Sequence, residues 1–193
     1  MTGRDTIELM NDKAKYEKQR TNKRMFWIDL EMTGLDERAD KILEIAVVIT
    51  DLDFEEKETY HRVVFQPKEI LDNMNDWCKN THGKSGLTAL VASGISIEQV
   101  DLDLLQLVTR HFLSEEKVVL CGNSVFMDKR FVDEYLKGFA KKLHYRLVDV
   151  TSFKEIFRSK YNVHVQKKEG HRALDDIRES INELKAYLAL VKP

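Results

Sequence analysis

Residues 25–35 read MFWIDLEMTGL, an apolar, strand-forming run that carries two acidic residues at spacing i, i+2. Because successive side chains of a β-strand point to opposite faces, Asp29 and Glu31 project from the same face, together with Trp27. The apolar residues between them take the other face. Carboxylates within a buried strand are costly unless a cation compensates their charge. The stretch therefore predicts a metal site on a strand of the core; the alternative is a strand whose acidic face meets solvent.

The length and composition favour a single folded domain. The chain has 193 residues, of which 42% are hydrophobic, enough for one substantial core. Charged residues make up 33%, yet the formal net charge is only −2. Proteins that grip long nucleic acids without sequence preference usually carry a clear basic excess. Any nucleic-acid substrate is therefore expected to be short or to be held by local contacts.

The N-terminal segment differs from the rest of the chain. Residues 1–24 hold seven Lys/Arg and four Asp/Glu, a net charge of +3, and few apolar residues. We expect them to form a disordered or loosely helical extension, and residues 25–193 to form the folded domain. The segment is too acidic for a mitochondrial presequence and lacks the apolar core of a secretion signal. With only two, widely separated cysteines, Cys78 and Cys121, the chain is expected to be reduced and cytoplasmic.

The rest of the chain alternates strands and helices. Two further strands are expected at 42–50 and 59–66, and the short acidic link between them predicts an antiparallel pair. The later expected elements are short helices over 68–90 broken at Gly83 and Gly86, a helix from Ser96 with Gln99 as its capping box, a strand over 117–121, a helix over 125–136, a strand over 145–150, a helix capped by Ser152 and Glu155, and a final helix over 172–191. This order predicts a mixed α/β layered domain.

The final helix has the clearest periodicity. Its apolar residues repeat at intervals of three and four, which predicts one stripe facing the core. They are Leu174, Ile177, Ile181, Leu184, Leu188 and Val191.

Two later acids interrupt this kind of pattern. Asp128 lies three and four residues before Phe131 and Val132, so it takes an inward-facing helical position where an apolar residue is expected. In the final helix, Asp176 lies about 110° from the centre of the apolar stripe, whereas Asp175 lies about 150° away and faces water. Asp176 is therefore the better candidate for a buried edge.

The resulting set of acids offers only oxygen ligands, which hard cations such as Mg²⁺ or Mn²⁺ prefer. Its members are Asp29, Glu31, Asp128 and Asp176. Four carboxylates suffice for two ions about 3.5–4 Å apart, which would clamp both sides of a phosphoryl displacement. His171 precedes the final helix, and a histidine there could take the proton of the attacking water.

Several motifs resemble those of the DEDD exonucleases: DLE at 29–31, GNSVFMD at 122–128 and HRALDD at 171–176. A histidine five residues before the last acid is typical of the His-type subgroup. Longer stretches resemble the oligoribonuclease family, over about residues 26 to 190. They are WIDLEMTGLD, DWCKNTHGKSGL, CGNSVFMDKRF, HYRLVDVTSFKE and HRALDDIRESI.

This resemblance implies a ribonuclease H-like fold with a mixed β-sheet, a homodimer, and 3′-to-5′ degradation of dinucleotides and very short RNA to 5′-mononucleotides. It also implies metal binding by the four acids, with His171 as general base. Seven further residues would contact the substrate: Leu35 as a wedge against a base, Trp77 and His82 in the pocket, Ser124 and Thr151 at the terminal 5′ phosphate, and Tyr145 and Arg146 donated across the dimer.

Two other functions remain open at the level of sequence. The first is an exonuclease of the same kind that acts on longer DNA or RNA. The second is a noncatalytic binder of short nucleotides that has kept the fold. Digestion of two-residue and longer oligonucleotides side by side distinguishes the first alternative from an enzyme that acts on very short RNA. Release of mononucleotides would exclude the second alternative.

Overall fold

The computed structural model describes residues 23–165 and 172–191. Apart from residues 23 and 24, the extension predicted from the sequence lies outside this part of the chain. The elements follow in the order β1 (Met25–Met32), β2 (Ile42–Thr50), β3 (Glu56–Val63), α2 (Lys68–Asp72), α3 (Asp76–Lys84), α4 (Leu87–Leu90), η1 (Val91–Ser93), α5 (Ile97–His111), β4 (Val118–Gly122), α6 (Val125–Tyr135), α7 (Lys137–Ala140), β5 (Leu143–Asp149), α8 (Val150–Tyr161) and α9 (Ala173–Leu190).

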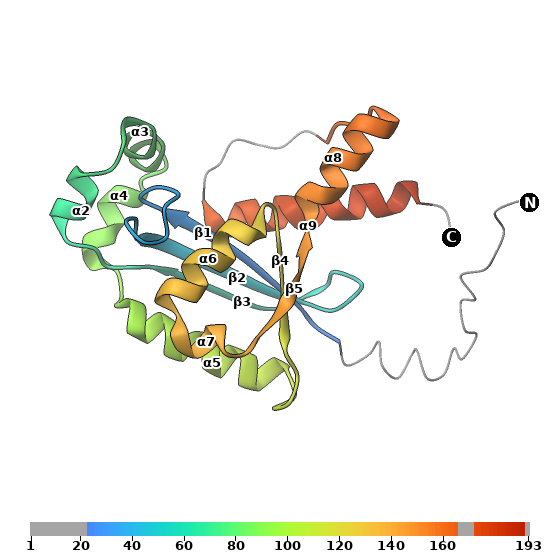
Figure 1. The fold of residues 1–193 in the computed structure, drawn as a ribbon, viewed down its shortest axis with the longest axis horizontal. Coiled ribbons are helices and arrows are strands. Elements are labelled where there is room, and N and C mark those ends of the chain that lie inside the picture. The colour runs from blue at the N-terminus through green and yellow to red at the C-terminus, as the bar shows by residue number, and fades with distance from the viewer. Residues whose placement is uncertain (1–22, 166–171, 192–193) are drawn as a thin grey trace, which may run out of the picture.

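The strands form one mixed sheet in the order β3-β2-β1-β4-β5 (Figure 1). β1 pairs antiparallel with β2, and β2 with β3, whereas β4 runs parallel to both β1 and β5. The mixed α/β sheet expected from the sequence is thus confirmed, with the acidic stretch on its central strand.

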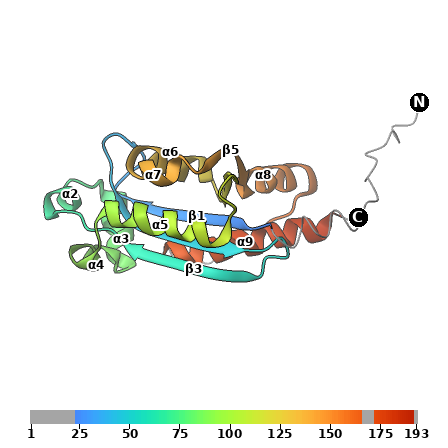
Figure 2. The same ribbon diagram turned by 90° about the horizontal axis from the view of Figure 1, so that it is seen from below.

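Each face of the sheet carries its own hydrophobic core. Phe26, Ile28 and Leu30 of β1 pack with residues of α5, α6 and α7, while Trp27 packs with α8 and α9. Figure 2 shows α6 and α7 on one side of β1 and α9 on the other. A smaller cluster joins Leu43 of β2 to the short helices α3 and α4. The alternation read from residues 25–35 therefore matches the two faces of the sheet.

Two predicted boundaries are wrong for local reasons. β3 spans Glu56–Val63 rather than 59–66, because the link from β2 closes in a tight turn. In that turn the Phe54 amide donates to the Asp51 carbonyl, and the Asp51 carboxylate accepts from two further amides. α8 begins at Val150 rather than Ser152, because the Asp149 side chain accepts from the Thr151 amide and serves as the N-cap.

Two other expectations also need correction. Gly83 lies inside α3, and the break between α3 and α4 falls at Ser85 and Gly86, where Gly86 has a φ of 77°. The stripe of α9 is core only through Leu184, since Leu188 and Val191 are exposed. The buried positions of α9 include polar and aromatic residues instead, namely Ser180, Glu183 and Tyr187. None of the described helices is long and apolar enough to cross a lipid bilayer.

Candidate active site

The carboxylates of β1 meet an acid of α9 on the face of the sheet that α9 covers. Asp29, Glu31 and Asp176 each place a carboxylate oxygen within 4.8 Å of the others. Asp176 lies in the first turn of α9 and is partly buried, whereas Asp175 is exposed, as the helical periodicity predicts. Two acids of one strand and an acid distant in sequence therefore form a cluster that could hold a cation.

Asp128 lies beside this cluster, on α6, and is only 5% exposed. β4 pairs with β1 only at Phe26 and Trp27. Further along the same edge of β1, the Leu30 amide donates to Asp128 Oδ1 at 2.9 Å. One oxygen of Asp128 is thus bound to the backbone between Asp29 and Glu31. The inward orientation predicted for Asp128 is confirmed.

The electrostatics of the site fit a bound cation. Burial raises the pKa of Glu31 to about 8, with further contributions from the negative charges of Asp176, Glu44 and Asp128. Burial also raises the pKa of Asp128, against the hydrogen bond from the Leu30 amide. Carboxylates crowded in this way are stabilised as anions when a cation lies among them. Because every donor is oxygen, the cation that fits is a hard divalent one.

An acid that was not identified from the sequence lies next to this cluster on the neighbouring strand. Glu44 of β2 faces Glu31 in the register of β1 and β2, and it is fully buried. Arg172 forms an ion pair with it at 2.7 Å, and His61 Nε2 lies 2.6 Å from the same oxygen. Burial alone would raise the pKa of Glu44, but these contacts lower it to about 2. The signal in the sequence was an acid inside the otherwise apolar run of residues 42–50.

The loop after β1 presents Leu35 to solvent. The Asp40 carboxylate accepts from the Thr33 hydroxyl and from the Asp36 amide, both at 2.9 Å. It occupies the space that a side chain at Gly34 would need, since a Cβ there would lie 2.3 Å from Asp40 Oδ2. Leu35 is 68% exposed at the tip of this closed loop. An apolar side chain held out in this way can contact a base.

Two predicted pocket residues lie on α3 in different environments. Trp77 is 63% exposed. His82 is buried, with Nε2 2.9 Å from the Met32 carbonyl oxygen and Nδ1 3.7 Å from a Glu31 oxygen. His82 therefore packs beside Glu31, whereas Trp77 presents an exposed aromatic surface.

Ser124 and Thr151 come together where the parallel strands β4 and β5 end. Their hydroxyl oxygens lie 3.1 Å apart, and the Ser124 amide donates to Thr151 Oγ1 at 2.8 Å. Each residue lies at the N-terminal end of a helix, α6 or α8. Helix N-termini and hydroxyl groups attract phosphate oxygens. Ser124 adopts a left-handed backbone, with a φ of 49°.

Tyr145 and Arg146 lie on β5, one of the two edge strands of the sheet. Tyr145 is 77% exposed and stacks on His144, with ring centroids 4.5 Å apart. Arg146 Nε donates to the Tyr145 hydroxyl at 3.2 Å. Both side chains are therefore presented outward, at an edge of the sheet. The last predicted residue, His171, lies outside the described residues.

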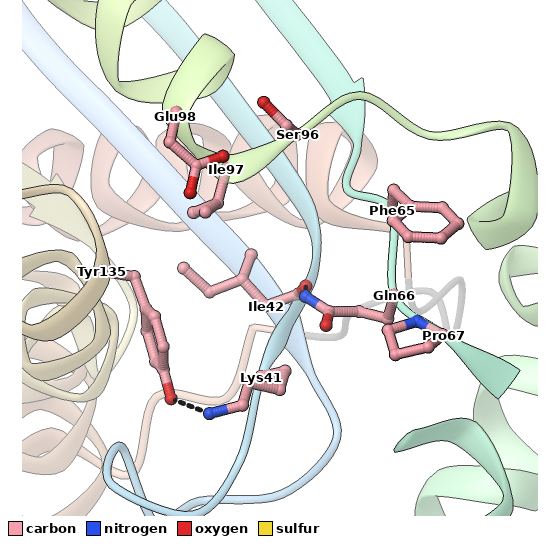
Figure 3. Close-up of a pocket in the computed structure, with 9 residues that line it drawn as sticks. All are labelled: Lys41, Ile42, Phe65, Gln66, Pro67, Ser96, Ile97, Glu98 and Tyr135. Carbon is pink, nitrogen blue, oxygen red and sulfur yellow. Dashed lines mark hydrogen bonds between the residues drawn. The ribbon is translucent and has the colours of Figure 1, made fainter. Parts of the chain in front are cut away.

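A cavity of about 260 Å³ lies away from these groups, between the loop 33–41, α5 and α6. Figure 3 shows Lys41, Phe65 and Tyr135 among its lining residues, with a hydrogen bond from Lys41 Nζ to the Tyr135 hydroxyl. The Tyr135 hydroxyl in turn donates to the Asp40 carbonyl at 2.6 Å. None of the predicted site residues lines this cavity. The hydrogen bonds of Tyr135 at its edge connect the loop to α6.

Comparison with known proteins identifies the family. An exonuclease family model, RNase_T, matches residues 26–184. The mitochondrial oligoribonuclease of Homo sapiens is 47% identical over 170 residues, which cover 85% of this chain and 71% of that protein. The chain belongs to the oligoribonuclease family of exonucleases. It is therefore a nuclease.

Relatives in this oligoribonuclease family occur in distant organisms. A probable oligoribonuclease of Dictyostelium discoideum is 47% identical over 174 residues, covering 88% of this chain and 91% of that one. The oligoribonuclease of Francisella tularensis is 45% identical over 168 residues, covering 84% of this chain and 93% of that one. The match therefore extends over almost the whole of these shorter relatives.

Solved structures show the same fold at much lower sequence identity. Exonuclease I of Methylocaldum szegediense superposes with a TM-score of 0.65 at 15% identity and covers 86% of this chain. Exonuclease I of E. coli, in complex with a 5cy-dT13 oligonucleotide, gives 0.65 at 11% identity over 88% of this chain. The chain spans about 40% of the length of these enzymes. The likeness shows a ribonuclease H-like fold.

Proposed function

We propose that the chain removes 5′-mononucleotides from the 3′ end of dinucleotides and very short RNA, with two divalent cations, Mg²⁺ or Mn²⁺, at the active site. The observation that carries the proposal is the convergence of Asp29, Glu31 and Asp176 within 4.8 Å. The buried Asp128 beside them supplies a fourth carboxylate. The names of the oligoribonuclease relatives support the reaction and its substrate.

The four acids would hold the cations, which supply, when bound, a water of lowered pKa and charge stabilisation of the departing oxygen. His171 is the proposed general base that takes the proton of the attacking water. The water oxygen forms the new bond to phosphorus, and the bond from phosphorus to the 3′ oxygen of the preceding nucleotide breaks. That 3′ oxygen takes up a proton and leaves.

The proposed preference for short RNA rests on the surroundings of the acid cluster. Leu35 and Trp77 offer exposed apolar surfaces, and stacking of an unpaired base on an aromatic face such as that of Trp77 contributes about 1–3 kcal/mol. We assign Ser124 and Thr151 to the terminal 5′ phosphate, where a closed end of the site would exclude longer strands by sterics. We assign His82 to the wall of the pocket. The low net charge of −2 agrees with a substrate that has few phosphates.

We further propose a homodimer in which Tyr145 and Arg146 reach the active site of the partner subunit. Their exposure on the edge strand β5 is consistent with a role outside their own protomer. An arginine fork binds a phosphate with two parallel hydrogen bonds, and a tyrosine ring stacks on a base.

The location and division of the chain are proposals that rest on sequence. We propose that the protein acts in the cytoplasm, that residues 1–24 form an extension, and that residues 25–193 form the exonuclease domain. Fractionation of cells that express the full chain tests the location. Recovery of the activity in the mitochondrial fraction would contradict it.

Length-resolved digestion tests the proposed function. 5′-Labelled RNAs of two residues and of increasing length are incubated with the protein in Mg²⁺ and, separately, in Mn²⁺, with EDTA as the metal-free control. We expect the dinucleotide to be consumed fastest and EDTA to stop the reaction. Faster digestion of long strands would favour a trimming or proofreading exonuclease, and absence of mononucleotide product would favour a noncatalytic binder.

A further inference from the structure

A charge network centred on the buried Glu44 connects the sheet to the beginning of α9. Arg172 donates to Glu44 Oε1 from Nε at 2.9 Å and from Nη2 at 2.7 Å. The Ala173 amide donates to the second oxygen, Oε2, at 3.2 Å, and His61 approaches Oε1 from β3. Both oxygens of a fully buried carboxylate are therefore bound, and most of the contacts come from the start of one helix.

Glu44 takes the place of a missing helix cap. Arg172, at the N-cap position of α9, makes no side-chain capping bond to its own helix. The amides of a first helical turn need acceptors from elsewhere, and a negative charge there is favoured by the helix dipole. Glu44 fills this role for Ala173 from a distance of 129 residues in sequence.

The same turn carries a member of the acid cluster. The Asp176 amide donates to the Arg172 carbonyl at 3.0 Å, so the backbone that Glu44 holds is the backbone that places Asp176. On the sheet, Glu44 faces Glu31 across β1 and β2. One network therefore fixes the distance between an acid of the sheet and an acid of the helix.

We propose that Glu44 and Arg172 are positioning residues of the metal site: they set the place of Asp176 relative to Glu31 without binding the cation themselves. This inference rests on the metal site of the proposed function.

Charge and position make opposite predictions for Arg172. A guanidinium near a cluster of acids repels a cation, so its removal by charge alone should tighten metal binding. If Arg172 acts by holding the first turn of α9, its removal should weaken metal binding instead. Supporting groups around metal ligands typically change metal affinity by about 10- to 100-fold.

The test is Mn²⁺ affinity, measured by electron paramagnetic resonance of free Mn²⁺ in titrations of the full chain without substrate. The variants are Arg172→Gln and Arg172→Lys, and the matched control is Arg178→Gln. Arg178 lies on the same helix and pairs with Glu56 of β3 at 3.0 Å, but at an exposed site. We expect roughly tenfold weaker binding in Arg172→Gln, a smaller loss in Arg172→Lys, and a change of less than about twofold in Arg178→Gln.

Unchanged or tighter Mn²⁺ binding in a folded Arg172→Gln protein would overturn the proposal. Should that variant not fold, the Lys variant, which keeps the charge but not the bidentate fork, decides alone, and unchanged affinity overturns the proposal. An equal loss of Mn²⁺ affinity in Arg178→Gln would show that any ion pair between the sheet and α9 matters. That result would also contradict a specific role of Arg172. Absence of Mn²⁺ binding in the unsubstituted protein would refute the metal site itself.

Discussion

Asp128 occupies a position that packing alone would give to an apolar side chain. Its pKa is raised by burial, so in the metal-free protein its ionised form is costly. Asp128→Asn keeps an oxygen for the Leu30 amide but removes the charge. We expect turnover of a dinucleotide in Mg²⁺ to fall by about 100-fold or more, without loss of metal-free stability at pH 8.

The matched control is Asp133→Asn, five residues further along α6, where the side chain is exposed. It should keep its activity within about twofold. Full activity of Asp128→Asn would remove Asp128 from the site. Initial rates of mononucleotide release and urea unfolding, measured on the same preparations, provide both readouts.

Glu31 predicts an unusual pH dependence of stability. Its pKa is about 8 in the folded protein, above that of an unfolded glutamate, so the folded state binds more protons between these two values. The free energy of unfolding therefore falls as pH rises through this range. In EDTA, we expect a lower urea midpoint at about pH 8.5 than at about pH 5.5.

Saturating Mg²⁺ should reduce this decline, because a cation among the acids stabilises their ionised forms. Glu31→Gln should reduce it in EDTA as well. The substitution should not abolish the decline, since the pKa of Asp128 is also raised. Glu44, with a pKa of about 2, does not titrate within this window. A stability that is independent of pH in EDTA would contradict the assignment.

At the scale of elements, the loop after β1 depends on the absence of a side chain at Gly34. A Cβ there would lie 2.3 Å from Asp40 Oδ2, and Asp40 cannot move without losing its bonds to Thr33 and Asp36. Gly34→Ala should therefore destabilise the protein by roughly 1–3 kcal/mol and raise KM through displacement of Leu35.

Gly83→Ala is the natural comparison for this substitution. Gly83 lies in α3 with open space around its Cα, so alanine should stabilise the protein by about 0.5–1 kcal/mol. Thermal unfolding and dinucleotide kinetics of the two variants separate the effect of the loop from the general effect of replacing a glycine. Equal changes of stability and KM in the two variants would contradict the proposal that Asp40 leaves no room for a side chain at Gly34.

The elements that could be predicted from the sequence are those whose residues obey a single local period. The alternation of residues 25–35 predicts that Trp27 and both acids of β1 lie on one face. The periodicity of α9 favours Asp176 over Asp175 as the acid at a buried edge. Asp128 is identified because it takes an inward-facing helical position where an apolar residue is expected. In each case the evidence lies within one helix or one strand.

The remaining features depend on contacts between distant segments. α8 begins early because Asp149, rather than the expected Ser152, caps it. Leu188 continues the apolar stripe of α9 but is exposed, whereas its neighbour Tyr187 is buried and stacks on Phe157 of α8. The role of Glu44 follows from an arginine 128 residues away, which no local pattern contains.

At the scale of the whole molecule, the proposal of an active site shared between two subunits can be tested by mixing two inactive variants. In a homodimer of Asp128→Asn the acid cluster is damaged, and in a homodimer of Arg146→Ala the donated arginine is missing. A mixed dimer contains one site with intact acids and an intact arginine from the partner. After unfolding and refolding together, equal amounts should recover about one quarter of the unsubstituted activity, because random pairing makes half of the dimers mixed.

If Arg146 acts within its own protomer, neither site of a mixed dimer is intact and no activity returns. Recovery therefore requires both dimerisation and donation across the interface. The mixture assayed before refolding is the control, since its subunits have not yet exchanged.

The chain order of the acid cluster has a consequence for synthesis in the cell. β1 leaves the ribosome before the other strands, but Asp176 lies on α9, which follows every strand in the sequence. α9 also supplies much of one core, so that face of the sheet is only partly covered until the helix has been made. A nascent chain thus carries two of the three clustered acids without being able to assemble the centre. The three clustered acids can therefore come together only after α9 has been synthesised.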